Sequence, residues 1–133
     1  MKATELRIGN LVFVDAKEGI YDYVNSIYEG YDNCYHIAFK QNRVILKDSN
    51  VVPIELSEAF FPSFGFIENP MGVFVLGKID LERISESQGF GVAINENPID
   101  VEIKYVHQLQ NIYHELTKKE LLFIESIIYA NKK

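Results

Sequence analysis

The sequence predicts a small α+β domain with two antiparallel β meanders, a short helix between them and a C-terminal pair of helices. Three observations predict this class. Short runs of β-branched and aromatic residues alternate with turn residues through most of the chain. The segment 57–63 combines a helix-capping serine with closely spaced phenylalanines, and from residue 105 apolar residues recur every three or four positions.

The first part of the chain, residues 1–56, is predicted to be β-rich. The expected strands are 7–14, 20–28, 35–39, 44–46 and 51–56, and turn residues occupy 15–19 and 29–33. Regularly spaced short strands are typical of an antiparallel meander or of a small barrel. The opening run Arg-Ile-Gly-Asn-Leu-Val-Phe-Val is similar to the first strand of many SH3-like barrels. We therefore expect either a meander or a small SH3-like barrel here.

A short connecting helix and a second meander are predicted next. Ser57 can cap a helix that runs to about Ser63, and Pro62 and Gly65 limit its length. Phenylalanines 60, 61 and 64 should face inward. Apolar runs at 72–76, 79–84, 90–94 and 99–103, with turns at 86–89 and 95–98, then predict the second antiparallel meander.

The C-terminal part is predicted to be a two-helix hairpin. Val106, Leu109, Tyr113 and Leu116 recur at helical spacing and form one apolar stripe. Thr117 and Glu120 match a capping box, so a second helix should begin there. Its apolar residues, between 121 and 128, cover more than one face. We therefore expect that helix to be sandwiched within the domain or paired with another subunit.

The opposite side of the first C-terminal helix is polar and is the candidate site for chemistry. Steps of three, four and seven residues bring four side chains to one side: His107, Gln110, Asn111 and His114. Histidine can act as a general base near neutral pH. The two histidines lie about 10 Å apart along a helix axis, too far to share one zinc ion. We expect no metal and no cofactor. The alternatives are a solvated face, or one that bonds loops of its own domain.

Tyrosines and acidic residues form the second candidate surface. Five tyrosines fall between residues 21 and 35, and tyrosine is favoured at protein interfaces. The candidate interaction residues are Tyr21, Tyr23, Tyr28, Tyr31, Asp100 and Glu102. The alternative for the tyrosines is cross-strand aromatic packing within the sheet.

Charge is concentrated on the second meander. The segment from Asp80 to Glu102 contains six acidic residues and one basic residue, Arg83, which gives −5 of the total charge of −6. Alternation places Asp100 and Glu102 on the solvent side. The surface is either a solvated sheet face or one that engages a basic partner. Because phosphate binding requires clustered lysine and arginine, we expect no direct nucleic-acid binding.

Three segments carry a family resemblance: ELRIGNLV (5–12), PIELSEAFFPSFGF (53–66) and YVHQLQNIYHELTKKEL (105–121). In this order they resemble a family of small uncharacterised bacterial proteins associated with prophages and other mobile elements. The chain departs from the family pattern at His114 and at Lys118 and Lys119. The resemblance implies a mobile-element context and a shared fold. It implies no catalytic residues.

Length and composition set the remaining limits. A chain of 133 residues with 47% hydrophobic residues is expected to form a single domain, with a subdivision between 1–56 and 57–133. Cys34 is the only cysteine, and no signal peptide or membrane-length apolar run is present, so a cytoplasmic location without membrane contact is expected.

Two functional hypotheses follow from these observations. The first is a non-catalytic protein-interaction or structural accessory protein of a mobile element, acting on an unknown protein partner or by self-association. The second is a small enzyme or ligand-binding domain that uses the polar face of the 105–116 helix.

Overall fold

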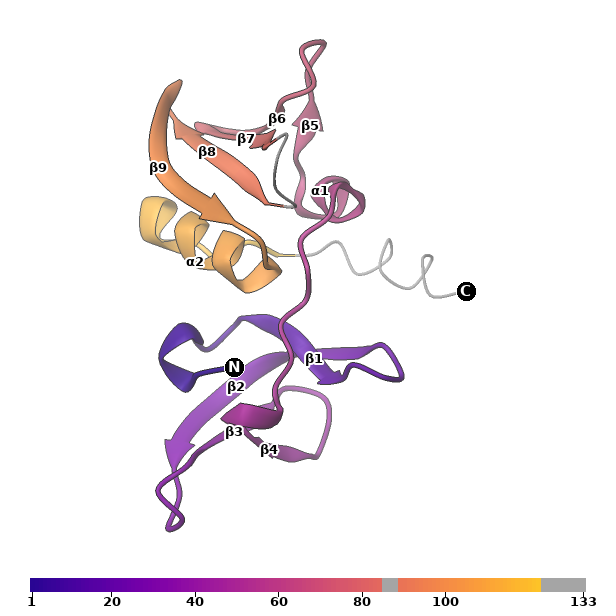
Figure 1. The fold of residues 1–133 in the computed structure, drawn as a ribbon, viewed down its shortest axis with the longest axis vertical. Coiled ribbons are helices and arrows are strands. Elements are labelled where there is room, and N and C mark those ends of the chain that lie inside the picture. Colours follow the sequence, from indigo (N-terminus) through magenta and orange to yellow (C-terminus); the bar gives the residue numbers. More distant parts are fainter. Residues whose placement is uncertain (85–88, 123–133) are drawn as a thin grey trace. The chain divides into compact units, whose positions relative to one another are not determined.

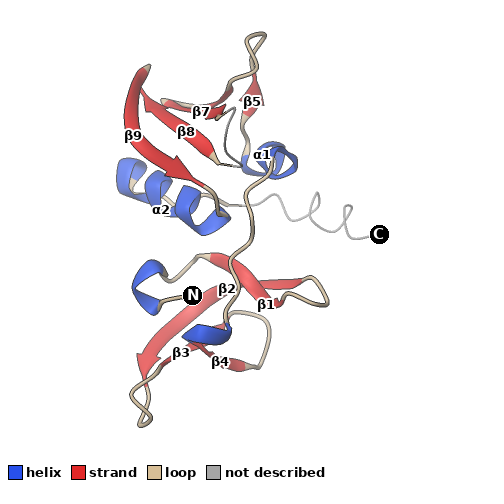
Figure 2. Cartoon of the chain, in the orientation of Figure 1, coloured by secondary structure: helices blue, strands red, loops and turns tan. Residues whose placement is uncertain are grey.

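The computed structural model describes residues 1–84 and 89–122 and contains two antiparallel sheets with few helices (Figures 1 and 2). This confirms the predicted mixture of mainly antiparallel strands with some helix. The chain divides into two compact units. Of the described residues, Met1–Glu55 and Tyr105–Ile112 form the first, and those of Leu56–Lys104 together with 113–122 form the second. Each unit is described by itself below.

The first unit contains a four-stranded sheet with the strand order β1-β2-β3-β4. The strands are β1 (Leu11–Asp15), β2 (Ile20–Glu29), β3 (Tyr35–Phe39) and β4 (Ile45–Lys47), and short 3-10 helices occupy Ala3–Glu5 and Asp48–Asn50. On the other side of β1, Phe13 forms an isolated antiparallel bridge with Val52, and the Phe13 amide donates to the Val52 carbonyl at 2.9 Å. The segment predicted as a strand at 51–56 therefore makes only isolated bridges.

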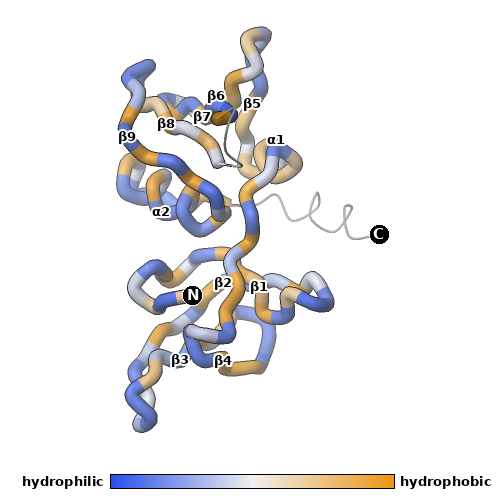
Figure 3. The backbone as a smooth tube through the Cα atoms, viewed as in Figure 1, coloured by the Kyte–Doolittle hydropathy of each residue, from blue (hydrophilic) through white to orange (hydrophobic). Residues whose placement is uncertain are grey.

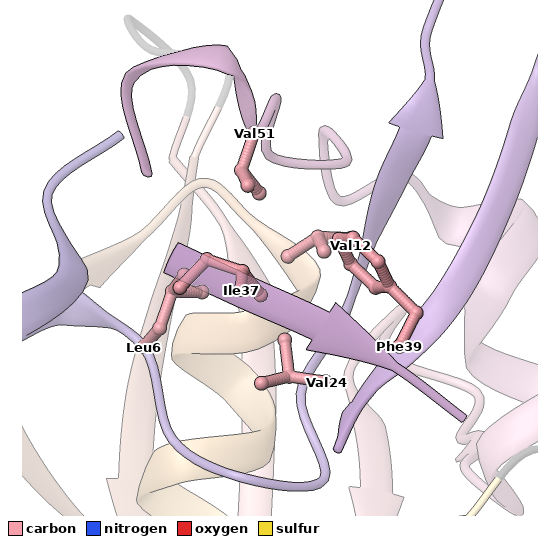
Figure 4. Packing of buried hydrophobic residues seen from close by; sticks show 6 residues of the cluster. All are labelled: Leu6, Val12, Val24, Ile37, Phe39 and Val51. Atoms are coloured by element: carbon pink, nitrogen blue, oxygen red, sulfur yellow. The ribbon is translucent and has the colours of Figure 1, made fainter. Parts of the chain in front are cut away.

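Alternating apolar residues build the core of the first unit. Six side chains gather on the inner side of the sheet (Figure 4). They are Leu6, Val12, Val24, Ile37, Phe39 and Val51. Because successive residues of a strand point to opposite faces, Ile37 is inside while its neighbours His36 and Ala38 lie on the other face. Burying each such side chain contributes about 1.5–3 kcal/mol before the entropy cost.

The first strand begins later than the sequence predicts. The expected strand was 7–14, whereas β1 begins at Leu11 because residues 7–10 form a turn. Gly9 has φ of 98°, a value that residues with a Cβ rarely adopt. The Asn10 side chain accepts a hydrogen bond from the Arg7 amide at 2.6 Å and closes the turn.

A phenylalanine cluster forms the centre of the second unit. A 3-10 turn (Glu58–Phe60) leads into the short helix α1 (Phe61–Phe64), which ends at Gly65 with φ of 97°. The ring of Phe61 is fully buried, and its centroid lies 4.6 Å from that of Phe74 and 4.9 Å from that of Phe90. The predicted cap at Ser57 is wrong, since its side chain makes no capping hydrogen bond.

The second sheet is a five-stranded antiparallel meander with the order β5-β6-β7-β8-β9. The strands are β5 (Ile67–Glu68), β6 (Phe74–Leu76), β7 (Ile79–Arg83), β8 (Phe90–Ile94) and β9 (Asn97–Ile103). The turn between β8 and β9 is tight because Asn95 and Glu96 both have positive φ. Hydrophobic and hydrophilic residues alternate along β9 (Figure 3), but a bulge interrupts its pairing with β8, so Ile103 is buried while Val101 is exposed.

The C-terminal helix α2 (Val106–Thr117) is present, but the predicted hairpin is not shown. The helix ends at Thr117, and the next residue, Lys118, has φ of 60° and donates its amide to the His114 carbonyl at 2.8 Å. Thr117 Oγ1 donates to the Tyr113 carbonyl at 2.8 Å and accepts from the Lys119 amide at 3.1 Å. Thr117 thus belongs to α2, and residues 118–122 are not helical, so the predicted second helix does not begin there. The predicted apolar stripe is also incomplete, because Leu116 is exposed. Residues 123–133 of the predicted second helix lie outside the described residues.

Candidate functional site

Gln110, from the predicted polar face of α2, is fully buried rather than solvated. Its Oε1 accepts a hydrogen bond from the Leu11 amide at 2.8 Å, and its Nε2 donates to the Gly9 carbonyl at 3.3 Å. The side-chain amide thus bonds two backbone groups at the start of β1, as a neighbouring strand would. Such a pair of bonds satisfies backbone groups that would be costly to bury without partners.

Asn111 extends the same network. Its Oδ1 accepts from Asn10 Nδ2 at 2.7 Å and from Arg7 Nε at 3.3 Å, and its Nδ2 donates to the Glu5 carbonyl at 3.4 Å. The amide group therefore has hydrogen-bond partners on both its oxygen and its nitrogen. Its role in the described residues is to hold the turn 5–10 against the start of α2.

The segments that carry the family resemblance meet in the first unit. The turn at 5–10 is bonded by Gln110 and Asn111, and the Val106 amide donates to the Ile54 carbonyl at 2.9 Å. A bridge between Glu55 and Tyr105 continues this pairing. Residues from all three segments are therefore used to anchor the N-terminal end of α2, which is a structural task.

His107 is only 3% exposed, and its Nδ1 has no hydrogen-bond partner among the described residues. Its ring stacks on that of Tyr105, with centroids 5.8 Å apart and planes 15° apart. Burial lowers the pKa of His107 because the charged form is poorly solvated, while the negative charge of Glu5 opposes this shift. The neutral imidazole is therefore the form that the fold favours.

This burial gives a pH dependence. Because the folded pKa of His107 lies below that of the unfolded chain, the unfolded state binds the proton more readily. Acidification from about pH 7 should therefore lower the stability as the pH passes through the unfolded value of about 6.5. His107→Phe should flatten this part of the curve. The measurement is the urea midpoint of both proteins between pH 5 and pH 8, about the window in which histidine titrates; parallel curves would contradict the assignment.

His114 belongs to the second unit, whereas Gln110 and Asn111 belong to the first. It is half-buried, and its Nε2 lies 4.0 Å from Oε1 of Glu120. Of the four residues of the predicted polar face, the structure thus brings only Gln110 and Asn111 into one hydrogen-bond network. His107 is enclosed and His114 faces an acid.

The predicted tyrosines fall into two groups along β2. Tyr21 packs edge-on against Phe13 with centroids 6.4 Å apart, and Lys40 Nζ lies 6.0 Å from the ring centroid of Tyr23. Tyr28 and Tyr31 instead reach solvent, with 44% and 111% relative exposure. Tyr35, which was not among the predicted contact residues, is 42% exposed at the start of β3.

The turn between β2 and β3 holds Tyr31 in a defined loop. The Gly30 amide donates to the Cys34 carbonyl at 2.8 Å, and the Asn33 amide donates to the Gly30 carbonyl at 3.2 Å. Asn33 has φ of 60°, the left-handed conformation that closes three-residue hairpin loops. These bonds close the loop of residues 31–33, in which Tyr31 is fully exposed.

Asp32 fastens this turn to β3 and β4. Its Oδ1 lies 3.0 Å from His36 Nε2, and its Oδ2 lies 3.2 Å from Lys47 Nζ. Hydrogen bonds from His36, from the Cys34 amide and from Lys47 hold the pKa of Asp32 well below its usual range. The His36 ring also stacks on Tyr28, at 5.6 Å between centroids. Sequence reasoning missed this cluster because its members come from three separate elements.

Gly30 leaves room for the His36 ring in this cluster. A Cβ at residue 30 would lie 2.4 Å from His36 Nε2, so any larger residue would displace the ring. The glycine thus lets His36 lie between Tyr28 and Asp32.

Asp100 and Glu102, the acidic members of the predicted patch, lie on β9 in the second unit. Both are exposed, and Glu102 pairs in register with Gly91 of β8. The predicted interaction residues therefore belong to two separately described surfaces.

Comparisons with protein-family models, curated proteins and solved structures gave no match. The resemblance described above therefore stays a prediction. In the described part of the chain, no helix is both long and apolar enough to cross a membrane.

Proposed function

We propose that this chain is a non-catalytic, cytoplasmic interaction protein of a mobile element that contacts a protein partner through the tip of the β2–β3 hairpin. The contact surface, here called the tyrosine tip, consists of Tyr28, Tyr31 and Tyr35. One observation carries the proposal: Tyr31 is fully exposed on a turn that the Asp32 contacts hold in place. The mobile-element setting rests on the family resemblance.

The physical argument is that an ordered, exposed aromatic cluster suits recognition. Tyrosine presents a large amphipathic surface with few rotatable bonds, so little entropy is lost when it is covered. The bonds of Asp32 to β3 and β4 reduce the freedom that the turn would otherwise lose on binding. A partner that covers Tyr31 would bury apolar surface that the free protein leaves in water.

The alternative function, an enzyme or ligand-binding domain on the polar face of α2, is less well supported. The side chains of Gln110 and Asn111 already form hydrogen bonds with backbone and side-chain groups of the same unit. A substrate would have to replace those bonds. His107 is buried and its pKa is lowered, which favours a packed neutral ring.

The test is partner capture by a tagged protein with single substitutions. Tyr31→Ala should reduce recovery of the bound protein at least about tenfold, because central tyrosines are common binding hot spots. Met71→Ala is the matched control, since Met71 is also exposed on a hairpin turn, the one between β5 and β6 of the second sheet. Recovery is quantified from nuclease-treated lysate after both variants are shown to unfold like the wild type. Equal recovery with Tyr31→Ala and wild type would rule out the tyrosine tip.

A further inference from the structure

The outer face of the second sheet carries acidic residues on β7 and β9 and only small residues on β8, the strand between them. Residues directed to the inner face, such as Leu81 and Val92, are buried. On the outer face, Glu82 of β7 and Glu102 of β9 both pair in register with Gly91 of β8. Two residues further along the same two strands, Asp80 pairs in register with Ala93. Gly91 thus lies between two acidic residues, although the Glu102 side chain lies against Gly89, and Ala93 lies between Asp80 and Pro98. We call this surface the acidic trough.

The fold does not require a glycine at position 91. Gly91 has no positive φ, and an added Cβ would come no closer than 3.9 Å to Glu82 or Ile84, which is ordinary van der Waals contact. Glycine in the middle of a strand weakens the strand. The missing side chain therefore costs stability without a local geometric reason, and it leaves Gly91 with no side chain of its own beside Glu82 and Ile84.

The trough continues into a hollow near the β6–β7 and β8–β9 turns. This hollow has a volume of about 460 Å³, and Asp80 belongs to both features. Its lining includes Glu96, Asn69 and Asn95, with Lys78 as its basic member. The carboxylates of Asp80 and Glu96 extend the negative surface beyond the strands.

A surface of opposite charge exists in the first unit. Residues 34–47 include Lys40, Arg43 and Lys47 but no acid, although the whole chain carries −6. Lys40 and Arg43 are exposed beside the exposed aliphatic side chains of Val44 and Ile45. We call the segment from Lys40 to Ile45 the basic loop.

Hydrogen bonds to Asp22 hold the backbone of the basic loop in place. Asp22 is buried, and its Oδ2 accepts from the Gln41 amide at 2.8 Å, the Asn42 amide at 2.7 Å and Asn42 Nδ2 at 2.8 Å. Three bonds to one carboxylate oxygen fix the loop backbone, so Lys40 and Arg43 extend from an ordered support. An ordered loop loses less entropy when it docks.

We propose that the acidic trough of one copy binds the basic loop of a second copy. Arg43 and Lys40 would lie near Asp80 and Glu82, and the aliphatic side chains would cover Gly91 and Ala93. The contact joins two different surfaces, so it is head-to-tail and leaves one trough and one loop free for further copies. It does not use the tyrosine tip and stands independently of the proposed function.

The charge pattern favours a second copy over a nucleic acid, because the trough is negative and would repel phosphate. At about 0.1 M salt, charges more than about 10 Å apart are screened, so the overall repulsion between copies weakens while close pairs persist. At about 1 M salt, where screening acts within about 3 Å, the contact should be lost.

Sedimentation velocity over a concentration series at about 0.1 M salt tests this contact. The wild type should form concentration-dependent oligomers. Gly91→Val should shift the protein to monomer while its thermal midpoint stays the same or rises, since a β-branched residue suits a strand. Arg43→Glu should also give monomer. A wild type that remains monomeric, or a Gly91→Val protein that associates normally, would overturn the proposal.

Mixing the two variants separates this contact from other kinds of association. Gly91→Val keeps an intact basic loop, and Arg43→Glu keeps an intact trough, so an equimolar mixture should form a one-to-one dimer and nothing larger. A mixture that stays monomeric would overturn the head-to-tail arrangement. Binding of the trough to an unrelated basic peptide with no self-association would assign it to another partner and overturn the second-copy proposal as well.

Discussion

Gln110→Leu is expected to lower the free energy of unfolding by about 3 kcal/mol, because two buried backbone groups lose their partners at once. Leucine has a similar size, but it can neither accept from the Leu11 amide nor donate to the Gly9 carbonyl. Urea denaturation measures the change. Glu115→Leu, on an exposed part of the same helix, is the control and should change stability by less than about 0.5 kcal/mol. A similar small effect for Gln110→Leu would contradict the bridging role.

A second substitution at the same position tests the hydrogen-bond directions. In Gln110→Glu the ionised carboxylate still accepts from the Leu11 amide, but its second oxygen faces and repels the Gly9 carbonyl oxygen. The protonated form can donate to that oxygen, so the folded pKa should lie above the unfolded value of about 4.3. The stabilisation by the protonated form is then complete below the unfolded pKa and is lost as the pH rises through the folded pKa. Stability that is unchanged between acidic and neutral pH would contradict these directions.

Asp22→Ala should destabilise the first unit by a similar amount, about 3 kcal/mol, because three donors from residues 41 and 42 lose one carboxylate oxygen. Asp22→Asn keeps an acceptor and should lose less. Asp15→Ala is a matched control, since exposed Asp15 accepts one bond from the Glu18 amide at 3.2 Å. Urea midpoints compare all three variants. Equal effects for Asp22→Ala and Asp15→Ala would show that the buried acceptor contributes nothing special.

Local patterns in the sequence were sufficient for much of the fold. The residues of β3 were predicted because Ile37 and Phe39 alternate with less buried positions, and strand alternation is a local signal. The start of α2 was predicted because Val106 and Leu109 recur at helical spacing, and both are buried. The tight turn at Asn95 and Glu96 followed from its turn-forming residues.

The errors arise where distant residues determine the structure. Gln110 looks like a surface residue by helical spacing, yet it is buried because Gly9 and Leu11, about 100 positions earlier, need partners. No local pattern contains that information. The Asn10 side chain ends the turn before β1, which shortened the predicted strand. At the other end of α2, Thr117 accepts the Lys119 amide, but Lys118 has a left-handed backbone and no helix begins at residues 118–122, although Thr117 and Glu120 match a capping box.

The tyrosine tip was only partly visible in the sequence. Clustering singled out Tyr28 and Tyr31, but it could not separate them from Tyr21, which packs against Phe13. Exposure depends on which strands lie beside each ring. The bonds from Asp32 to His36 and Lys47 depend on the pairing of β3 with β4, which composition does not reveal.

Site-specific photo-crosslinking tests the proposed function most directly. A photoreactive amino acid is placed at position 31 in one protein and at position 71 in another, and each is illuminated in a lysate of the source cells. The proposal requires one discrete heavier species from position 31 that is absent from position 71. No crosslinked species at position 31, or the same species from both positions, would contradict the tyrosine tip as the contact surface.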